Sequence, residues 1–320
     1  MEDRRGTRRL GRLRPRTALI WIAAVVVVLV AVDVVLVSLA LGRTAPGDHR
    51  EPGPIPTYTS TPAPTAPATP GASATPSASA SAGSADAASG RRLLSAVDSR
   101  EAWRASSTSC SAAQAVLEHS VDGGATWVTV PLAEDVRSVT GLRASAGSVS
   151  ILAGVGKDCT PTVRTSADGG DTWIAGKAGA AGAGISGSSL QLATGSVDAP
   201  CADPVDAYQG QYTTVVACAS EVQWRSGTGA WVGVPLTGIL AIADAGSTYA
   251  LARVGSSTCD GVEIVRLPAT AVTSRTPVTP IGCWSDGGSA APVAIDMAGT
   301  ALWAWAGDET AVSGNGGASW

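Results

Sequence analysis

The sequence contains no phenylalanine, only two histidines and no pair of cysteines at Cys-x-x-Cys spacing. His119 is the only histidine after residue 90, so that part of the sequence cannot supply a metal site built from several histidines. Residues 91–320 hold thirteen Lys and Arg against twenty Asp and Glu, a balance of −7. Because an acidic domain does not favour phosphate-rich partners, we expect no nucleic acid ligand, and we assign no metal or cofactor.

The N-terminal part has the pattern of a membrane anchor. Residues 1–17 carry seven arginines, and residues 18–41 form an apolar run about as long as a membrane-spanning helix needs to be. The arginines precede the run, so we expect a cytoplasmic N-terminus and an extracellular C-terminal domain on a single-pass cell-membrane protein. A signal peptide cleaved after Ser38-Leu39-Ala40 is the alternative, but the run is longer than a usual signal core and favours an uncleaved anchor.

Residues 42–90 predict a disordered linker. They consist mainly of Pro, Ser, Thr, Ala and Gly. Such a segment has too little large apolar surface to offset the entropy lost on folding. We therefore expect the folded domain to occupy residues 91–320.

An eight-residue phrase occurs three times in that domain, at residues 120–127, 166–173 and 313–320. Its two glycines permit a tight reversal, and the Asp or Asn before them can bond its own backbone. The Trp opens the next strand as an apolar anchor. Each copy therefore predicts a structural corner between two strands. The corner residues are Ser120, Asp122, Gly124, Thr126 and Trp127; Ser166, Asp168, Gly170, Thr172 and Trp173; and Ser313, Asn315, Gly317 and Trp320.

Short alternating runs around the corners predict an all-β fold. The first two corners are 46 residues apart, about the length of one four-stranded propeller blade. We predict a β-propeller of about five four-stranded blades behind a transmembrane helix and a disordered linker. The sequence stops at Trp320, where the outer strand of the last blade should begin. Three arrangements fit this: a short last blade, completion by a strand near residues 91–96, or an open ring. The predicted strands are 93–97, 102–105, 115–119 and 127–130; 139–145, 148–154, 162–166 and 172–175; 189–194, 212–218, 221–225 and 231–234; 239–243, 249–254, 263–267 and 271–274; and 293–296, 301–306 and 310–313.

The phrase Ser-x-Asp-x-Gly-x-Thr-Trp resembles the Asp-box, or bacterial neuraminidase repeat, of β-propellers. Two copies match in full, and the third has Asn315 and Ser319 in place of Asp and Thr. The resemblance covers residues 92–320 and implies a corner on the blade periphery, away from the ligand face. Sialidases, sortilin-type receptors and photosystem assembly factors share the phrase, so it implies a fold and not a function. The Phe-free composition is typical of a GC-rich, actinobacterial-like genome.

The six cysteines all follow residue 90, in the domain predicted to be exported, and predict disulfides. Four of them precede the third strand of a predicted blade, so we expect them at one end of the ring. We expect Cys201–Cys218 and Cys259–Cys283 because they are close in sequence, and Cys110–Cys159 as a tie between adjacent blades.

The sequence favours a non-enzymatic module that binds a protein or a glycan at the cell surface. A sialidase-like glycoside hydrolase and an envelope assembly scaffold are the alternatives. The resemblance implies that a sialidase would need three arginines and a tyrosine–glutamate pair, and no residue here aligns with them. We therefore assign no catalytic residue, and we interpret His119 as a surface residue rather than a general base.

Overall fold

The structure, a computed structural model, describes residues 91–107, 110, 115–287 and 292–320. The predicted basic tail, transmembrane helix and linker lie outside the described residues. Within those residues every regular element is a β-strand. No helix among them is long and apolar enough to cross a membrane.

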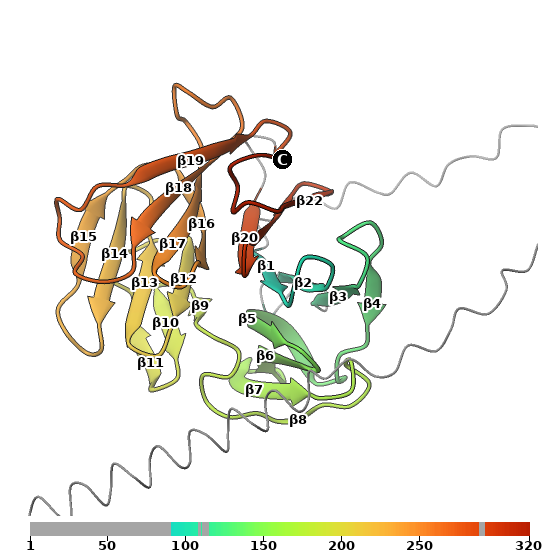
Figure 1. Cartoon of the computed structure of the whole chain (residues 1–320). Coiled ribbons are helices and arrows are strands. Elements are labelled where there is room, and N and C mark those ends of the chain that lie inside the picture. The colour runs from blue at the N-terminus through green and yellow to red at the C-terminus, as the bar shows by residue number, and fades with distance from the viewer. Residues whose placement is uncertain (1–90, 108–109, 111–114, 288–291) are drawn as a thin grey trace, which may run out of the picture. The chain divides into compact units, whose positions relative to one another are not determined.

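Six antiparallel sheets surround a common centre and form a six-bladed β-propeller (Figure 1). Blades 1 to 3 comprise β1 (Arg91–Ala96), β2 (Ala102–Ser107), β3 (Val116–Ser120) and β4 (Val128–Val130); β5 (Val136–Ser145), β6 (Ser148–Val155), β7 (Thr160–Ser166) and β8 (Ile174–Ala175); and β9 (Gly184–Ser186), β10 (Ser189–Leu192) and β11 (Gly195–Asp198). Blades 4 to 6 comprise β12 (Asp206–Gln209), β13 (Thr213–Ala217), β14 (Glu221–Ser226) and β15 (Val232–Pro235); β16 (Ile239–Asp244), β17 (Thr248–Arg253), β18 (Val262–Pro268) and β19 (Thr279–Trp284); and β20 (Val293–Ala298), β21 (Ala301–Ala306) and β22 (Glu309–Ser313).

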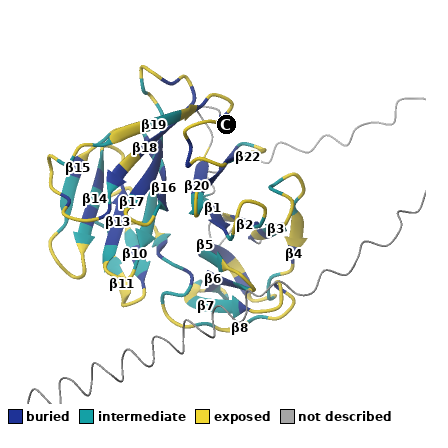
Figure 2. Ribbon diagram, in the orientation of Figure 1, coloured by how far each residue is buried: buried dark blue, intermediate teal, exposed yellow. Residues whose placement is uncertain are grey.

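The ring closes by packing, without a strand shared between the first and last blades. Strand β1 is the innermost strand of blade 1, and it contacts both β5 of blade 2 and β20 of blade 6. Trp303 and Trp305 of β21 are buried against Leu94 and Ala102 of blade 1. The Trp303 indole also donates a 2.7 Å hydrogen bond to the Asp98 carbonyl of blade 1. Figure 2 shows buried residues toward the ring centre and exposed ones on outer strands such as β4.

The prediction of about five blades was wrong, because residues 176–234 form two blades instead of one. The predicted first strand at 189–194 belongs to blade 3, whereas the inner strand of blade 4 is Asp206–Gln209. That strand escaped notice because it is polar. Its Asp206 and Gln209 side chains accept backbone hydrogen bonds from neighbouring segments, so its sequence shows no apolar alternation. Blade 3 has three strands rather than the four expected of a blade. Blade 6 also has three, which agrees with the short last blade, one of the three alternatives for the end of the ring.

The outer strand of blade 5 lies at residues 279–284 rather than at the predicted 271–274. Val272 is buried, which explains the apolar pattern there. Ala271, however, has a φ of 54°, a left-handed conformation that a strand residue does not adopt. The segment is therefore a loop that packs one side chain into the core.

The three corners share one hydrogen-bond pattern. In the first, the Ser120 hydroxyl accepts from the Gly124 amide at 3.0 Å, and Asp122 accepts from both the amide and the hydroxyl of Thr126. These hydrogen bonds, the strongest from the Thr126 hydroxyl, lower the pKa of Asp122 to about 2. The third corner keeps the geometry, with Asn315 accepting from the Ser319 amide and donating to its hydroxyl.

The second glycine of each corner also packs closely against the preceding blade. A Cβ on Gly124 would lie 2.9 Å from Thr310 of blade 6, and one on Gly317 would lie 3.1 Å from Ile264 of blade 5. A Cβ on Gly170 would overlap Val130 of blade 1. The second glycine of each phrase therefore sets the approach of neighbouring blades as well as the turn.

We expect Gly170→Ala to destabilise the domain more than Gly169→Ala. Both glycines have positive φ, so either substitution adds about 1 kcal/mol of backbone strain. A Cβ at 169 meets open space, whereas one at 170 meets Val130 and adds about 1–3 kcal/mol of overpacking. Denaturant unfolding of the two variants measures the difference, and equal losses would contradict a corner that packs against the preceding blade.

Candidate functional site

A cavity of about 640 Å³ opens on the ring axis, lined by residues from the first half of five inner strands and by the last residues of β9 in blade 3. Its volume lies in the usual range for ligand sites, about 300–1,000 Å³. Every blade contributes to its wall from its innermost strand. The contributing residues include Arg91 of β1, Thr140 of β5, Ile185 of β9, Asp206 of β12, Leu240 of β16 and Val293 of β20.

The Asp-box corners lie at the opposite end of the ring. Gly154 and Cys159, which line the cavity, flank the turn from β6 to β7, and the second corner follows the far end of β7. The antiparallel order of the strands places the first and third corners at that far end too. None of the predicted corner residues lines the cavity.

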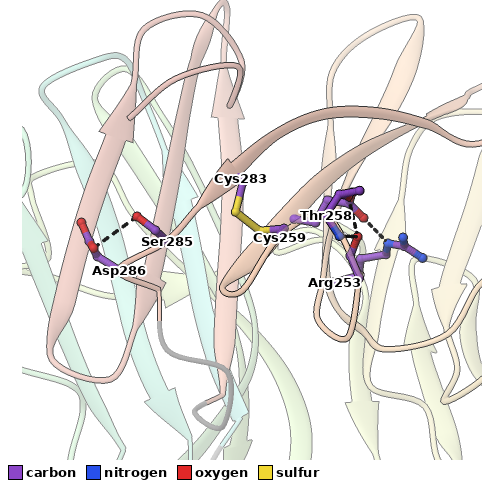
Figure 3. The surroundings of a disulfide bond; sticks show 8 residues. Arg253, Thr258, Cys259, Cys283, Ser285 and Asp286 are labelled. Carbon is purple, nitrogen blue, oxygen red and sulfur yellow. Dashed lines mark hydrogen bonds and ion pairs between the residues drawn. A yellow bond between two sulfur atoms is a disulfide. The ribbon is translucent and has the colours of Figure 1, made fainter.

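The three expected disulfides, Cys110–Cys159, Cys201–Cys218 and Cys259–Cys283, are confirmed. Four of the cysteines lie in the loops before the third strands of blades 1, 2, 4 and 5, as expected. The Cys110–Cys159 bond ties blade 1 to blade 2 and lines the cavity itself. Figure 3 shows Cys259–Cys283 near Arg253 and Thr258, which both bond to the buried Glu263 carboxylate.

One ion pair crosses the cavity wall between opposite blades. The Arg91 guanidinium of blade 1 pairs with Asp206 of blade 4 and also donates to the Thr140 carbonyl of blade 2. The other oxygen of Asp206 accepts from the Ile242 amide of blade 5 at 2.8 Å. Asp206 is the only carboxylate among the described lining residues, and it is fully engaged.

Arg92 also lines the cavity, and its guanidinium stacks 4.4 Å from the ring centroid of Trp305. Burial lowers the pKa of Arg92 from its usual value, although Asp308 acts in the opposite direction. Arg91 Nε and Arg92 Nη1 are buried and have no hydrogen-bond partner within the described part of the chain. The wall therefore carries two cations and one carboxylate.

A narrower channel of about 270 Å³ adjoins the cavity along the axis, sharing Arg91, Arg92 and Asp206 with it. Arg143, Tyr208, Asp244 and Asp296 are among its other lining residues. The Tyr208 hydroxyl donates to Asp244, and burial raises the pKa of this phenol well above its usual value. The Tyr208 hydroxyl is thus held protonated and is oriented by the Asp244 carboxylate.

Side chains from the inner strands clasp adjacent blades along this channel. Asp296 of blade 6 accepts from the Ala96 amide of blade 1 at 2.8 Å, which helps to close the ring. Ser95 of blade 1 accepts from the Ala144 amide of blade 2, also at 2.8 Å. These bonds satisfy amides that point away from the blade's own ladder.

A sialidase needs three arginines near a tyrosine, and Arg91, Arg92, Arg143 and Tyr208 line the channel together. Arg91 and Arg92 line the cavity, but no described tyrosine does. Arg143 lies in the channel with Tyr208, where it donates a 2.8 Å hydrogen bond to the Gln209 carbonyl. Arg91 pairs with Asp206 and Arg143 bonds the Gln209 carbonyl. Arg92 stacks on Trp305 and keeps an unpaired Nη1, so the three guanidiniums have different protein partners.

Several sequence interpretations look different in three dimensions. His119 is half-buried, not a free surface residue: its ring stacks 4.0 Å from Trp103 and contacts Glu101 at 3.1 Å. Arg91, Arg92 and Asp206 escaped the sequence analysis as site residues. One sequence feature pointed to this site: two consecutive arginines at the start of the first strand of a domain with a net negative charge.

No protein-family model and no curated protein matches the sequence. Among solved structures, the chain is similar to a GH74 enzyme from Niastella koreensis, at 13% identity over 70% of this chain and 45% of that one, with a TM-score of 0.41. It is similar to YCF48 bound to D1 peptide, at 15% identity over 71% and 65%, with a TM-score of 0.28. It is also similar to Bacteroides ovatus xyloglucan PUL GH43B, at 13% over 67% and 47%, with a TM-score of 0.38. The chain thus spans about half the length of the first of these, and likenesses this distant concern the fold alone.

Replacing Asp296 tests the clasp that closes the ring. Burial raises the pKa of Asp296 to about 6, above its usual 3.8, despite hydrogen bonds from Ala96 and Met297 that act the other way. The folded state therefore favours the protonated acid, and this contribution to stability is lost as the pH rises through 6. An asparagine keeps the acceptor for Ala96 without the charge. We expect Asp296→Asn to stabilise the domain at pH 8 by up to about 3 kcal/mol, and much less at pH 4.

Denaturant unfolding at the two pH values measures this effect. Asp168→Asn is the control, because hydrogen bonds from Thr172 lower the pKa of Asp168 to about 2. Its ionised form stabilises the fold at neutral pH, so that variant should be destabilised at pH 8. A loss of stability in Asp296→Asn at pH 8 would contradict our account of the clasp.

Proposed function

We propose that residues 91–320 form a non-enzymatic binding module, held at the cell surface by the predicted N-terminal anchor. The ligand binds in the axial cavity, at the end of the ring opposite the Asp-box corners. The observation that carries this proposal is the cavity itself: about 640 Å³, walled by all six inner strands and bordered by the Cys110–Cys159 disulfide. Rigid strands and a covalent tie give a preformed site.

The wall supports binding rather than glycoside hydrolysis. Hydrolysis of this kind uses two carboxyl groups on either side of the bond to be broken. The described wall offers only Asp206, and that carboxylate accepts hydrogen bonds from Arg91, Ala207 and Ile242. All three donors belong to the protein, so both oxygens of this carboxylate are already occupied.

The chemistry of the wall favours a protein segment over a glycan. Ile185, Val205, Leu240 and Val293 provide aliphatic surface, and no aromatic side chain is found among the described lining residues. Aliphatic side chains of a peptide bury apolar area against such a wall. Sugars expose hydroxyls that need many polar partners.

The cavity also lies where the chain joins its linker. Arg91 lines the cavity and directly follows the segment 42–90. If the chain is anchored in a membrane, the linker leaves the domain at the same end as the mouth of the cavity. A partner in the cell envelope, including one that the module helps to assemble, suits this position.

Ser186→Trp tests the proposal by filling the cavity. Ser186 is exposed and lines the cavity, so a tryptophan there occupies ligand space at little cost to the core. Ser188→Trp is the matched control, since Ser188 is exposed in the same turn but does not line the cavity. We expect peptides selected from a display library on the full chain in detergent to lose at least about tenfold in affinity with Ser186→Trp only.

A glycan array run on the same three proteins examines the other ligand class. Array hits that depend on Ser186, without peptide binders, would replace the protein ligand with a glycan. Ligands that bind Ser186→Trp and the parent chain equally well would show that the cavity is not the binding site.

A further inference from the structure

We infer that the axial cavity recognises the C-terminal carboxylate of a peptide, with Arg91 and Arg92 as the cationic side of the site. This inference rests on the proposed binding function and specifies its ligand. Three features of the cavity lead to it: its charge, its position on the axis and the composition of its wall.

The charge of the wall is opposite to that of the domain around it. Residues 91–320 have a balance of −7, whereas the charged lining residues are Arg91, Arg92 and Asp206. Asp206 compensates Arg91, which leaves the guanidinium of Arg92 in excess. Asp308 is the acidic residue that acts on Arg92, but it is solvent-exposed and does not line the cavity.

The two guanidiniums are also short of hydrogen-bond acceptors. Arg91 Nε and Arg92 Nη1 are buried without a partner among the described residues. A buried donor that is left unpaired costs about 1–3 kcal/mol, and more when the group is charged. An anionic group in the cavity lessens this cost because it compensates the charge on both side chains.

The axial position selects a chain terminus. Since all six inner strands surround the cavity, a segment that enters along the axis arrives end-on. Of the two ends of a peptide, the carboxylate suits a wall with excess positive charge, and the ammonium does not. The aliphatic residues of the wall then contact the side chains that precede the carboxylate.

The test uses two peptide pools on the full chain in detergent. Both are N-acetylated tetrapeptides randomised over Ala, Val, Leu and Ile; one pool carries free C-terminal acids and the other C-terminal amides. Affinity selection with mass spectrometry measures retention. We expect the acid pool to be retained at least about tenfold more strongly, with the ratio falling in 1 M salt because salt screens the attraction.

Arg92→Gln should abolish most of the preference for the acid pool, and Arg92→Lys should restore part of it through charge alone. Arg225→Gln is the matched control. Arg225 stacks 4.3 Å from the Trp231 centroid and also has a buried unpaired Nε, but it does not line the cavity. A preference unchanged in Arg92→Gln would overturn the inference, provided that the melting temperature shows a folded variant.

The outcomes separate this inference from the proposed function. Equal retention of acid and amide pools, lost with Ser186→Trp, would leave a peptide-binding cavity without carboxylate recognition. Retention of neither pool at the cavity would count against both. Ser186-dependent binding of glucuronic acid, with no peptide retained, would assign the carboxylate to an acidic sugar and overturn the peptide ligand.

Discussion

The inner edge of each blade imposes the constraint on which this ring depends. An edge strand carries amide groups that its own sheet does not bond, and six such edges face one axis. Asp296, Ser95 and Asp206 each accept an amide from the next blade at 2.8 Å, so polar side chains hold neighbouring edges together. The channel is polar for this structural reason.

The two ends of the ring then carry different tasks. At one end the Asp-box corners set the approach of neighbouring blades, as Gly124 does against Thr310 across the closure. At the other end the disulfides fix the loops, and the inner strands wall the cavity. Because the corners stabilise the ring without touching the cavity, the residues that line the cavity are free to suit a ligand.

The repeated phrase and the cysteine positions predicted much of the fold, and the polar segments concealed the rest. Blades 1 and 2 follow the predicted strands because both end in intact corners. Blade 3 has no corner phrase, and the inner strand of blade 4 has the polar sequence Asp-Ala-Tyr-Gln. The sequence analysis therefore combined blades 3 and 4 into one predicted blade. Only the partners of Asp206, which lie 36 and 115 residues away, explain why that strand is polar.

The sequence by itself determined the all-β class and the turns at the three corners, and it predicted three cysteine pairs that the structure confirms. These features depend on local backbone chemistry or on residues close in the repeat. The tertiary structure alone decided the number of blades, the closure by Trp303 and Trp305, and the site formed by Arg91, Arg92 and Asp206. Closure of the ring brings residues from opposite blades to one axis. The spacing of residues along the sequence does not indicate which of them will come into contact there.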